Sequence, residues 1–233
     1  VELVEATTRA DEVHGVGAEG VVQRQQVRAM LAVYRDQARR HGWPAVDLER
    51  AAATMRLPGR YEVWGRTPRL VLDTAHNEQA LARTVEQWSA ESMRDARVLV
   101  LGATEGKSID GVLGALAASA RTILVTAPHW PRARSAPDLA GALSAAADAC
   151  GQPTEVLVVG SVRASLEEAR RRARDMPLAG PAPSVLVTGS HFLVAEALDR
   201  LGVDDLLQED QVPLWDAGLA LRRRPGGRAE AVV

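Results

Sequence analysis

The sequence predicts an α/β protein with a doubly wound, mostly parallel, Rossmann-like sheet, and two patterns carry this prediction. Five apolar runs rich in Val, Leu and Ile are each followed by a segment with helical periodicity. The runs are continuous and do not alternate, as in parallel strands that helices cover on both faces. We therefore expect a sheet domain at residues 58–205, after a helical and linker region at residues 1–57 and before a tail at residues 206–233.

The region before the sheet domain is expected to hold one long helix. Residues 1–19 look irregular apart from a short strand in "VELVEA", and helical spacing of apolar residues runs from Gly20 to His41. The motif "GWP" ends that helix, and "DLERAAATM" predicts a short second one. The turn "LPGR" then precedes a strand, "YEVWG". The sheet domain is therefore entered through a turn that ends in Arg60.

Five β-α units follow in order along the chain. The expected strands are residues 69–73, 97–102, 121–126, 154–160 and 184–189. The expected helices are residues 77–91, 108–118, 136–150, 161–175 and 190–201. In the third unit Ser135 is suited to cap the helix, because its hydroxyl can accept from a free N–H group, and Pro137 fits the first turn.

The composition limits the range of functions. The net charge is -2, which gives no reason to expect nucleic acid or a membrane as partner, and no apolar run is long enough to span a bilayer. The first residues are charged and do not form a signal peptide. Cys150 is the single cysteine, so no intramolecular disulfide is expected. We expect a cytoplasmic protein that acts on small molecules.

The function is expected at the carboxyl ends of the strands, where open parallel sheets bind ligands. Four polar segments lie there: "DTAHN", "ATEGKS", "TAPHWPRARS" and "TGSH". Two glycine motifs are weak. "GVGAEG" at residues 15–20 lacks the strand that precedes a dinucleotide site, and "GATEGKS" at residues 102–108 is one residue too short for a P-loop. Lys107, the only lysine, could still hold an anion beside the start of the next helix, or it could be an exposed surface lysine.

Arg60 and Asp73 lie at neighbouring ends of two expected strands. An arginine can hold a phosphate with several directed donors, and a carboxylate at a strand end can accept from both hydroxyls of a ribose. His76 and Asn77 follow where the helix begins. Asn77 could instead serve as the N-cap, and His76 taken alone could be a structural or solvated histidine. The four residues together indicate a nucleotide site.

These motifs resemble a known family. "PGRYEV", followed by "DTAHN" thirteen residues after the arginine, resembles the signature of folylpolyglutamate synthases and dihydrofolate synthases, which belong to the wider Mur ligase family. The resemblance continues in order through "VLVLGATEGKSIDGVL", "PRARSAPDLAGAL" and "VLVTGSHFLVAEAL", and covers about residues 20–202. It implies the Rossmann-like C-terminal domain of a Mur ligase, which closes over ATP held by another domain.

The resemblance also implies a reaction and a role for each residue. ATP would phosphorylate the carboxylate of a folate or a pteroate, and the amine of glutamate would displace phosphate. Arg60 would contact the ATP phosphates and Asp73 the ribose, with His76 and Asn77 beside the nucleotide. Lys107 would hold the carboxylate of glutamate, with Ser190 near the same substrate. We therefore expect Lys107 and His76 to serve catalysis in a magnesium-dependent ligase of one-carbon metabolism.

Departures from the family pattern leave four alternatives open. Relatives carry a true P-loop in an N-terminal ATPase domain, and residues 1–57 would be a remnant of that domain. The resemblance assigns Mg²⁺ mainly to the absent half, so no metal ligand is expected in this chain. The chain could be a fragment of a ligase, or one subunit that works with a separate ATPase half. It could also be a stand-alone nucleotide- or anion-binding module, or a non-catalytic relic. Catalysis by this chain alone is not expected.

Overall fold

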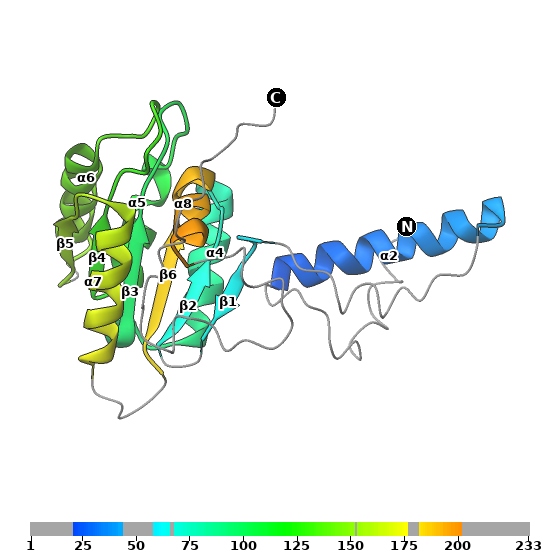
Figure 1. Cartoon of the computed structure of the whole chain (residues 1–233), viewed down its shortest axis with the longest axis horizontal. Coiled ribbons are helices and arrows are strands. Elements are labelled where there is room, and N and C mark those ends of the chain that lie inside the picture. Colours follow the sequence, from blue (N-terminus) through cyan, green and yellow to red (C-terminus); the bar gives the residue numbers. More distant parts are fainter. Residues whose placement is uncertain (1–20, 44–57, 66–67, 152, 177–181, 202–233) are drawn as a thin grey trace, which may run out of the picture.

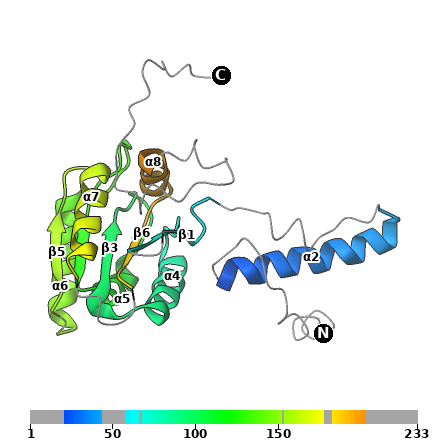
Figure 2. The ribbon, with the colours of Figure 1, turned by 60° about the horizontal axis from the view of Figure 1, so that its bottom comes forward.

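The computed structural model describes residues 21–43, 58–65, 68–151, 153–176 and 182–201. Helix α2 (Val21–His41) agrees with the expected long helix and stands to one side of the sheet domain (Figures 1 and 2). The expected strand within residues 1–19, the short helix at residues 47–55 and the tail at residues 206–233 lie outside the described residues. No helix in the described part of the chain is both long and apolar enough to cross a membrane.

The sheet has six strands in the order β1-β2-β6-β3-β4-β5. All pairs are parallel except β1 with β2, whose connection is too short for a crossover. The prediction of a mostly parallel, doubly wound sheet is therefore confirmed. The strands are β1 (Glu62–Trp64), β2 (Arg69–Leu72), β3 (Arg97–Leu101), β4 (Thr122–Val125), β5 (Glu155–Val158) and β6 (Ser184–Thr188).

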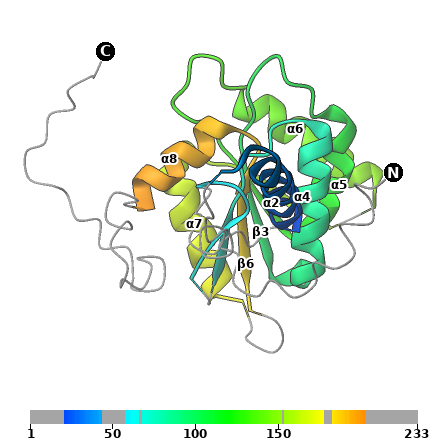
Figure 3. The same ribbon diagram turned by 90° about the vertical axis from the view of Figure 1, so that its right-hand side faces the viewer.

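Helices cover both faces of the sheet, and Figure 3 shows the three layers. They are α4 (Glu78–Glu91), α5 (Leu113–Ser119), α6 (Ala136–Ala149), α7 (Val162–Arg174) and α8 (His191–Leu201), with a 3₁₀ turn at Arg94–Ala96. One core packs α4, α5 and α6 against side chains such as Leu99 and Leu186, and the other packs α7 and α8 against side chains such as Val100 and Val187. These neighbouring strand residues point to opposite faces, which explains why the strands are apolar throughout.

The chain reverses its direction across the sheet after β5. Strands β3, β4 and β5 follow one another outward, and α7 then returns the chain to β6, which lies between β2 and β3. Leu99 pairs with Leu186, and Leu101 with Thr188, so β3 and β6 end at the same level. Ligands of open α/β sheets bind at such a reversal point, at the carboxyl ends of the strands. A ligand site is therefore expected at the carboxyl ends of β2, β6 and β3.

The helix expected at residues 108–118 begins later than predicted. A 3₁₀ turn, η2 (Asp110–Val112), precedes α5, which starts only at Leu113. The carboxylate of Glu78 accepts hydrogen bonds from the Ser108 hydroxyl at 2.9 Å and from the Gly111 N–H at 3.0 Å. Because both donors are held by Glu78 on α4, residues 108–112 form a loop and a 3₁₀ turn, and not the first turn of an α-helix. The prediction of a helix start directly beside Lys107 is wrong: Lys107 lies in the loop before η2.

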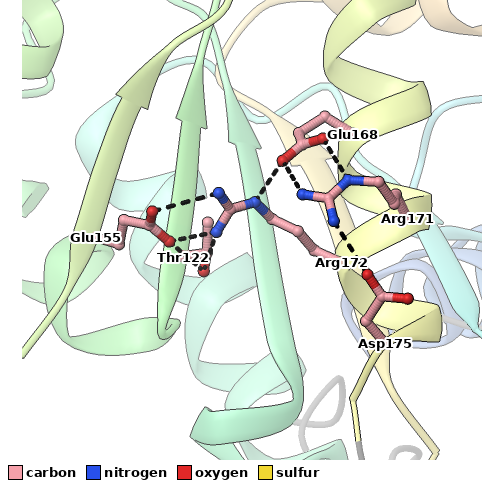
Figure 4. Close-up of polar contacts among 6 residues, drawn as sticks. All are labelled: Thr122, Glu155, Glu168, Arg171, Arg172 and Asp175. Atoms are coloured by element: carbon pink, nitrogen blue, oxygen red, sulfur yellow. Dashed lines mark hydrogen bonds and ion pairs between the residues drawn. The ribbon is translucent and has the colours of Figure 1, made fainter.

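An ion-pair network covers the edge strand β5 (Figure 4). Arg172 on α7 pairs with the carboxylates of Glu155 on β5 and of Glu168. Arg171 also pairs with Glu168, at 2.7 Å, and its hydrogen bond is the main cause that lowers the pKa of Glu168 to about 2. Charged groups along an edge strand discourage pairing with a further strand. These charged side chains therefore disfavour the addition of a further strand beside β5. Strand β5 is the edge strand on the opposite side of the sheet from β1.

Candidate functional site

Arg60 stands exposed between two residues with left-handed backbone. Gly59 has a φ of +66° and Tyr61 a φ of +52°. A Cβ atom on Gly59 would lie 2.8 Å from the nearest side-chain atom, so only glycine fits there. The Gly59 N–H donates to the Glu62 carboxylate at 2.8 Å, and the Gly59 carbonyl accepts from the Thr74 N–H at 2.8 Å. The turn that presents Arg60 is thereby tied to β1 and to the segment after β2.

Asp73 lies buried directly after β2, and the residue is only 4% exposed. One carboxylate oxygen accepts from the Tyr61 N–H at 2.8 Å, and the other accepts from the Ala75 N–H and the Thr84 hydroxyl, both at 2.9 Å. Burial raises the pKa of Asp73, while these hydrogen bonds and the nearby charge of Arg60 oppose that rise. The carboxylate therefore joins the Arg60 turn, the β2–α4 segment and α4.

His76 and Asn77 occupy the start of α4 as expected. Asn77 is the N-cap, since its side-chain oxygen accepts from the Ala80 N–H at 2.9 Å. This confirms the capping interpretation of Asn77; a contact with nucleotide stays a prediction. His76 lies half-buried, with Nδ1 at 3.0 Å from the Thr74 carbonyl and its ring centroid 4.3 Å from that of His191. The imidazole of His76 is thereby held against α8.

The loop that carries Lys107 is fixed by its neighbour, the β4–α6 loop. The Glu105 N–H donates to the Arg132 carbonyl at 2.8 Å, and the Arg134 N–H donates to the Ala103 carbonyl at 2.9 Å. Gly106, with a φ of +77°, makes the tight turn just before the lysine. Lys107 itself is exposed at the tip. The two loops, at the top of Figure 1, therefore present one lysine ammonium to solvent at the carboxyl edge of the sheet.

Ser190 is fully buried where β6 passes into α8. Its hydroxyl accepts from the Phe192 N–H at 3.2 Å, as an N-cap does, and lies 3.1 Å from the Thr104 hydroxyl. The preceding Gly189 donates its N–H to the Ala75 carbonyl at 3.0 Å. Ser190 thus lies at the predicted helix start and connects α8 to the β3 loop, and a direct contact with substrate stays a prediction.

His191 is the residue around which the predicted site residues gather. Burial lowers the pKa of His191, electrostatic interactions with His76, Arg60 and Lys107 lower it further, and Asp73 acts in the opposite direction. These influences place all four residues in the electrostatic surroundings of one imidazole. Sequence reasoning did not single out His191, although it named the polar segment "TGSH" that contains it. This edge of the sheet brings together the cations Arg60 and Lys107 and the imidazoles of His76 and His191, and it can attract an anionic ligand.

An exposed aromatic stack borders this site. The ring centroids of Trp130 and Phe192 lie 3.8 Å apart with planes tilted by 12°, and each residue is more than a third exposed. The His129 N–H donates to the Glu196 carboxylate at 2.9 Å, which ties the β4–α6 loop to α8. Sequence reasoning named the segment "TAPHWPRARS" but not Trp130. Because Phe192 directly follows His191, the stack lies at the same start of α8.

Fold and site together define an α/β domain with basic side chains gathered at the carboxyl edge of its sheet, where open α/β sheets bind ligands. Within that class, the chain belongs to the family described as Mur ligase, glutamate ligase domain, whose model matches residues 59–191. The match includes the Arg60 turn, the β2–α4 segment, the Lys107 loop and the end of β6. It confirms the family resemblance that the sequence motifs indicated.

Two curated relatives are described as "Probable bifunctional folylpolyglutamate synthase/dihydropteroate synthase". The protein of Haloferax volcanii is 34% identical over 157 residues, which are 66% of this chain and 17% of that protein. The protein of Halobacterium salinarum is 36% identical over 169 residues, which are 71% of this chain and 19% of that protein. This chain therefore spans less than a fifth of the length of these relatives.

Solved structures of folate ligases share the fold. E. coli FolC in complex with DHPP and ADP superposes with a TM-score of 0.60 at 22% identity, over 78% of this chain and 39% of that chain. Mycobacterium tuberculosis folylpolyglutamate synthase complexed with ADP and AMPPCP gives 0.56 at 25% identity, over 65% and 34%. A bifunctional folylpolyglutamate synthase/dihydrofolate synthase with Mn, AMPPNP and L-glutamate bound gives 0.56 at 22%, over 75% and 38%.

Proposed function

We propose that this chain supplies the C-terminal domain of an ATP-dependent ligase that adds glutamate to the carboxylate of a folate or dihydropteroate through an acyl phosphate. The observation that carries the proposal is the gathering of Arg60, His76, Lys107 and His191 at one sheet edge in a member of the glutamate ligase family. The reaction handles a triphosphate and several carboxylates, so a cationic edge suits every ligand involved.

The proposed chemistry needs charge neutralisation and positioning more than it needs a protein nucleophile. The substrate carboxylate attacks the γ-phosphate of ATP and ADP leaves; the amine of glutamate then attacks the acyl carbon and phosphate leaves. Arg60 would stabilise negative charge on the phosphates, and Lys107 would hold a carboxylate of glutamate. His76 would lie between the two ligands, and Ser190 would fix the helix end beside them. Domain closure would bring both cations to the reacting groups.

Magnesium does not fit the residues described here. Among those residues no three His, Cys, Asp or Glu side chains lie together as metal ligands, and the buried carboxylate of Asp73 already accepts three hydrogen bonds. The described edge carries cations, which repel a divalent ion. The structure with Mn and AMPPNP supports metal use by a relative. We propose that any Mg²⁺ is held by another part of the ligase.

The first test is ADP affinity of the full chain with Arg60→Ala, measured by calorimetry. We expect the Kd for ADP to rise by about 10- to 100-fold, because hydrogen bonds to charged groups contribute about 1.5–3 kcal/mol. Arg121→Ala is the matched control, since Arg121 is an exposed arginine directly before β4, at the amino ends of the parallel strands, and should leave the Kd unchanged. The same titrations are repeated with the ATPase half of a relative added. Equal affinity of wild type and Arg60→Ala would refute the nucleotide role.

A stand-alone anion-binding module is the second candidate function. The observation that favours it is that the cations Arg60 and Lys107 both lie among the described residues, while the loop that carries Lys107 does not have the P-loop spacing. This candidate predicts that ADP and inorganic tripolyphosphate bind the chain, while glutamate and the ATPase half of a relative change neither affinity. Ligation of glutamate by the combined halves would exclude it.

Anion affinity is expected to depend on pH through His191. Because the pKa of His191 is lowered below its ordinary value of about 6.5, the ring is neutral at pH 7.5 and gains a proton only in more acidic solution. The added positive charge tightens binding of tripolyphosphate as pH falls from 7.5 to 5.5. His191→Asn should lose part of that gain. The ratio of the wild-type and variant Kd values at each pH cancels titration of the ligand, and a constant ratio would contradict the role of His191.

A further inference from the structure

The backbone around the exposed Lys107 is held on both sides of the lysine. Before it, the Glu105 N–H donates to the Arg132 carbonyl at 2.8 Å. After it, Ile109 is fully buried, and the carboxylate of Asp110 pairs with Arg134 at 3.1 Å. The direction in which the lysine leaves the protein therefore depends on contacts that neighbouring elements make with its loop.

The contact directly after the lysine comes from Glu78, the first residue of α4. One oxygen of its carboxylate, Oε1, accepts from the Ser108 hydroxyl at 2.9 Å and from the Gly111 N–H at 3.0 Å. A Cβ atom on Gly111 would lie 3.0 Å from this carboxylate, so glycine permits the close approach. Since Ser108 follows Lys107 in the chain, the start of α4 fixes the backbone on the carboxyl side of the lysine.

Helix α4 also contacts the turn that carries the other cation. At the last residue of the helix, the Glu91 carboxylate accepts from the Tyr61 hydroxyl at 2.6 Å, and Tyr61 directly follows Arg60. The segment with His76 leads into the first turn of the same helix. Helix α4 therefore connects the Arg60 turn and the His76 segment to the loop of Lys107.

We propose that Glu78 is a positioning residue: its hydrogen bonds to Ser108 and Gly111 hold the Lys107 loop against α4 and thereby direct the lysine ammonium toward the carboxylate of glutamate. The proposal rests on the proposed function in one respect, namely that Lys107 holds this carboxylate. A carboxylate in the first turn of a helix also stabilises the helix by its charge alone. The test must therefore separate the reach of the Glu78 side chain from its charge.

Two substitutions make this separation. Glu78→Gln removes the charge but keeps the length and one side-chain oxygen, which can replace Oε1 as acceptor of both hydrogen bonds. Glu78→Asp keeps the charge at the helix start but shortens the side chain by one methylene, so its oxygens no longer reach the two donors. Positioning predicts damage from Glu78→Asp and little from Glu78→Gln, whereas a charge effect predicts the reverse order. Glu86→Asp shortens an exposed glutamate further along the same helix and is the matched control.

A lysine-specific protease reports on this loop without any ligand. Lys107 is the only lysine, so the protease cuts the full chain at one bond, between Lys107 and Ser108. Cleavage requires this segment to leave its place in the fold. Rates in native buffer are divided by rates in urea, which removes the effect of each substitution on the protease itself. Mass spectrometry follows the products.

We expect Glu78→Asp to speed native cleavage about fivefold, the factor that corresponds to one hydrogen bond of ordinary net strength. Glu78→Gln should stay within about twofold of wild type, and Glu86→Asp should not change the rate. Ser108→Ala removes one donor without altering α4 and should also speed cleavage; in that background Glu78→Asp should add less than it does alone. Unchanged cleavage in Glu78→Asp, or equal acceleration by Glu78→Gln, would overturn the proposal.

The ligase reconstituted with the ATPase half of a relative gives the second reading. We expect Glu78→Asp to lower kcat/KM for glutamate about fivefold and to leave the KM for ATP within about twofold. In a Lys107→Ala background the same substitution should have no further effect, because Glu78 acts through the lysine. A loss that persists without the lysine would overturn the proposal. Unchanged glutamate use in Lys107→Ala itself would instead contradict the proposed function, so the two failures are distinguishable.

Discussion

Replacing Gly189 by alanine is expected to lower the free energy of unfolding by about 3–5 kcal/mol, since overpacking and a left-handed backbone each cost about 1–3 kcal/mol. Gly189 has a φ of +105°, and a Cβ atom there would lie 2.5 Å from the carbonyl oxygen of Gly102 and 2.9 Å from Leu101. The nearest atom belongs to the backbone, so it cannot turn away as a side chain would. The ends of β3 and β6 would have to separate.

Gly141→Ala is the matched control for this prediction. Gly141 lies exposed inside α6, and a Cβ atom there would meet nothing within 4 Å. We expect this variant to gain about 0.5–1 kcal/mol, the usual advantage of alanine over glycine in a helix. Urea unfolding of both variants against wild type measures the difference. A Gly189→Ala variant within about 0.5 kcal/mol of wild type would show that β3 and β6 do not approach as closely as described.

Gly189 also affects the candidate site, because it connects β6 to the start of α8. Gly189 donates to the Ala75 carbonyl, and the buried Ser190 and the exposed His191 follow it. A shift at Gly189 would therefore move the N-terminus of α8 away from His76. Loss of tripolyphosphate affinity should accompany loss of stability in the folded fraction of this variant.

Replacing Lys107 by alanine is expected to lower kcat/KM for glutamate by about 100-fold in the ligase reconstituted with the ATPase half of a relative. An ion pair between an ammonium and a carboxylate in a closed site contributes about 1.5–3 kcal/mol, and about 2.7 kcal/mol corresponds to about 100-fold. Lys107 stands exposed on a loop held by the Arg132 and Arg134 backbone, so the loss should come from the ammonium and not from unfolding. The KM for ATP should stay within about twofold.

Arg121→Ala controls for the change in net charge. Arg121 is an exposed cation directly before β4, at the opposite edge of the sheet from Lys107. Initial rates at varied glutamate and saturating ATP separate the two variants. If Lys107→Ala raised the KM for ATP and left glutamate unaffected, the lysine would belong to the nucleotide side of the site, and our assignment would be wrong.

Much of the fold follows from the sequence because its signals are local. Continuous apolar runs predicted the parallel strands, and Ser135 and Asn77 predicted helix starts that the structure confirms through their side-chain hydrogen bonds. The place of β6 between β2 and β3 was not predicted. Strand neighbours depend on contacts between distant segments, and uniformly apolar strands do not specify which neighbour each one takes. The late start of α5 has the same origin, because Glu78 acts on it from α4.

The sequence predicted some residues of the candidate site but not others. Arg60, Asp73 and Lys107 lie at strand ends, so their approach follows from the topology of any such sheet. The burial of Asp73 does not follow, because it depends on Tyr61 in a conformation that tyrosine rarely adopts. His191 was overlooked because a lone histidine at a helix start has no distinctive sequence signal. Only its contact with His76 makes it part of the site.

The most direct test of the proposed function is glutamate ligation by two chains. The full chain is mixed with the part of the M. tuberculosis folylpolyglutamate synthase that it does not match, and phosphate release is followed with ATP, glutamate and a folate or dihydropteroate acceptor. The account predicts phosphate release that requires both chains and glutamate, and a glutamate adduct of the acceptor by mass spectrometry. A mixture that forms a complex and binds ATP, yet releases no more phosphate than the ATPase half alone, would contradict it.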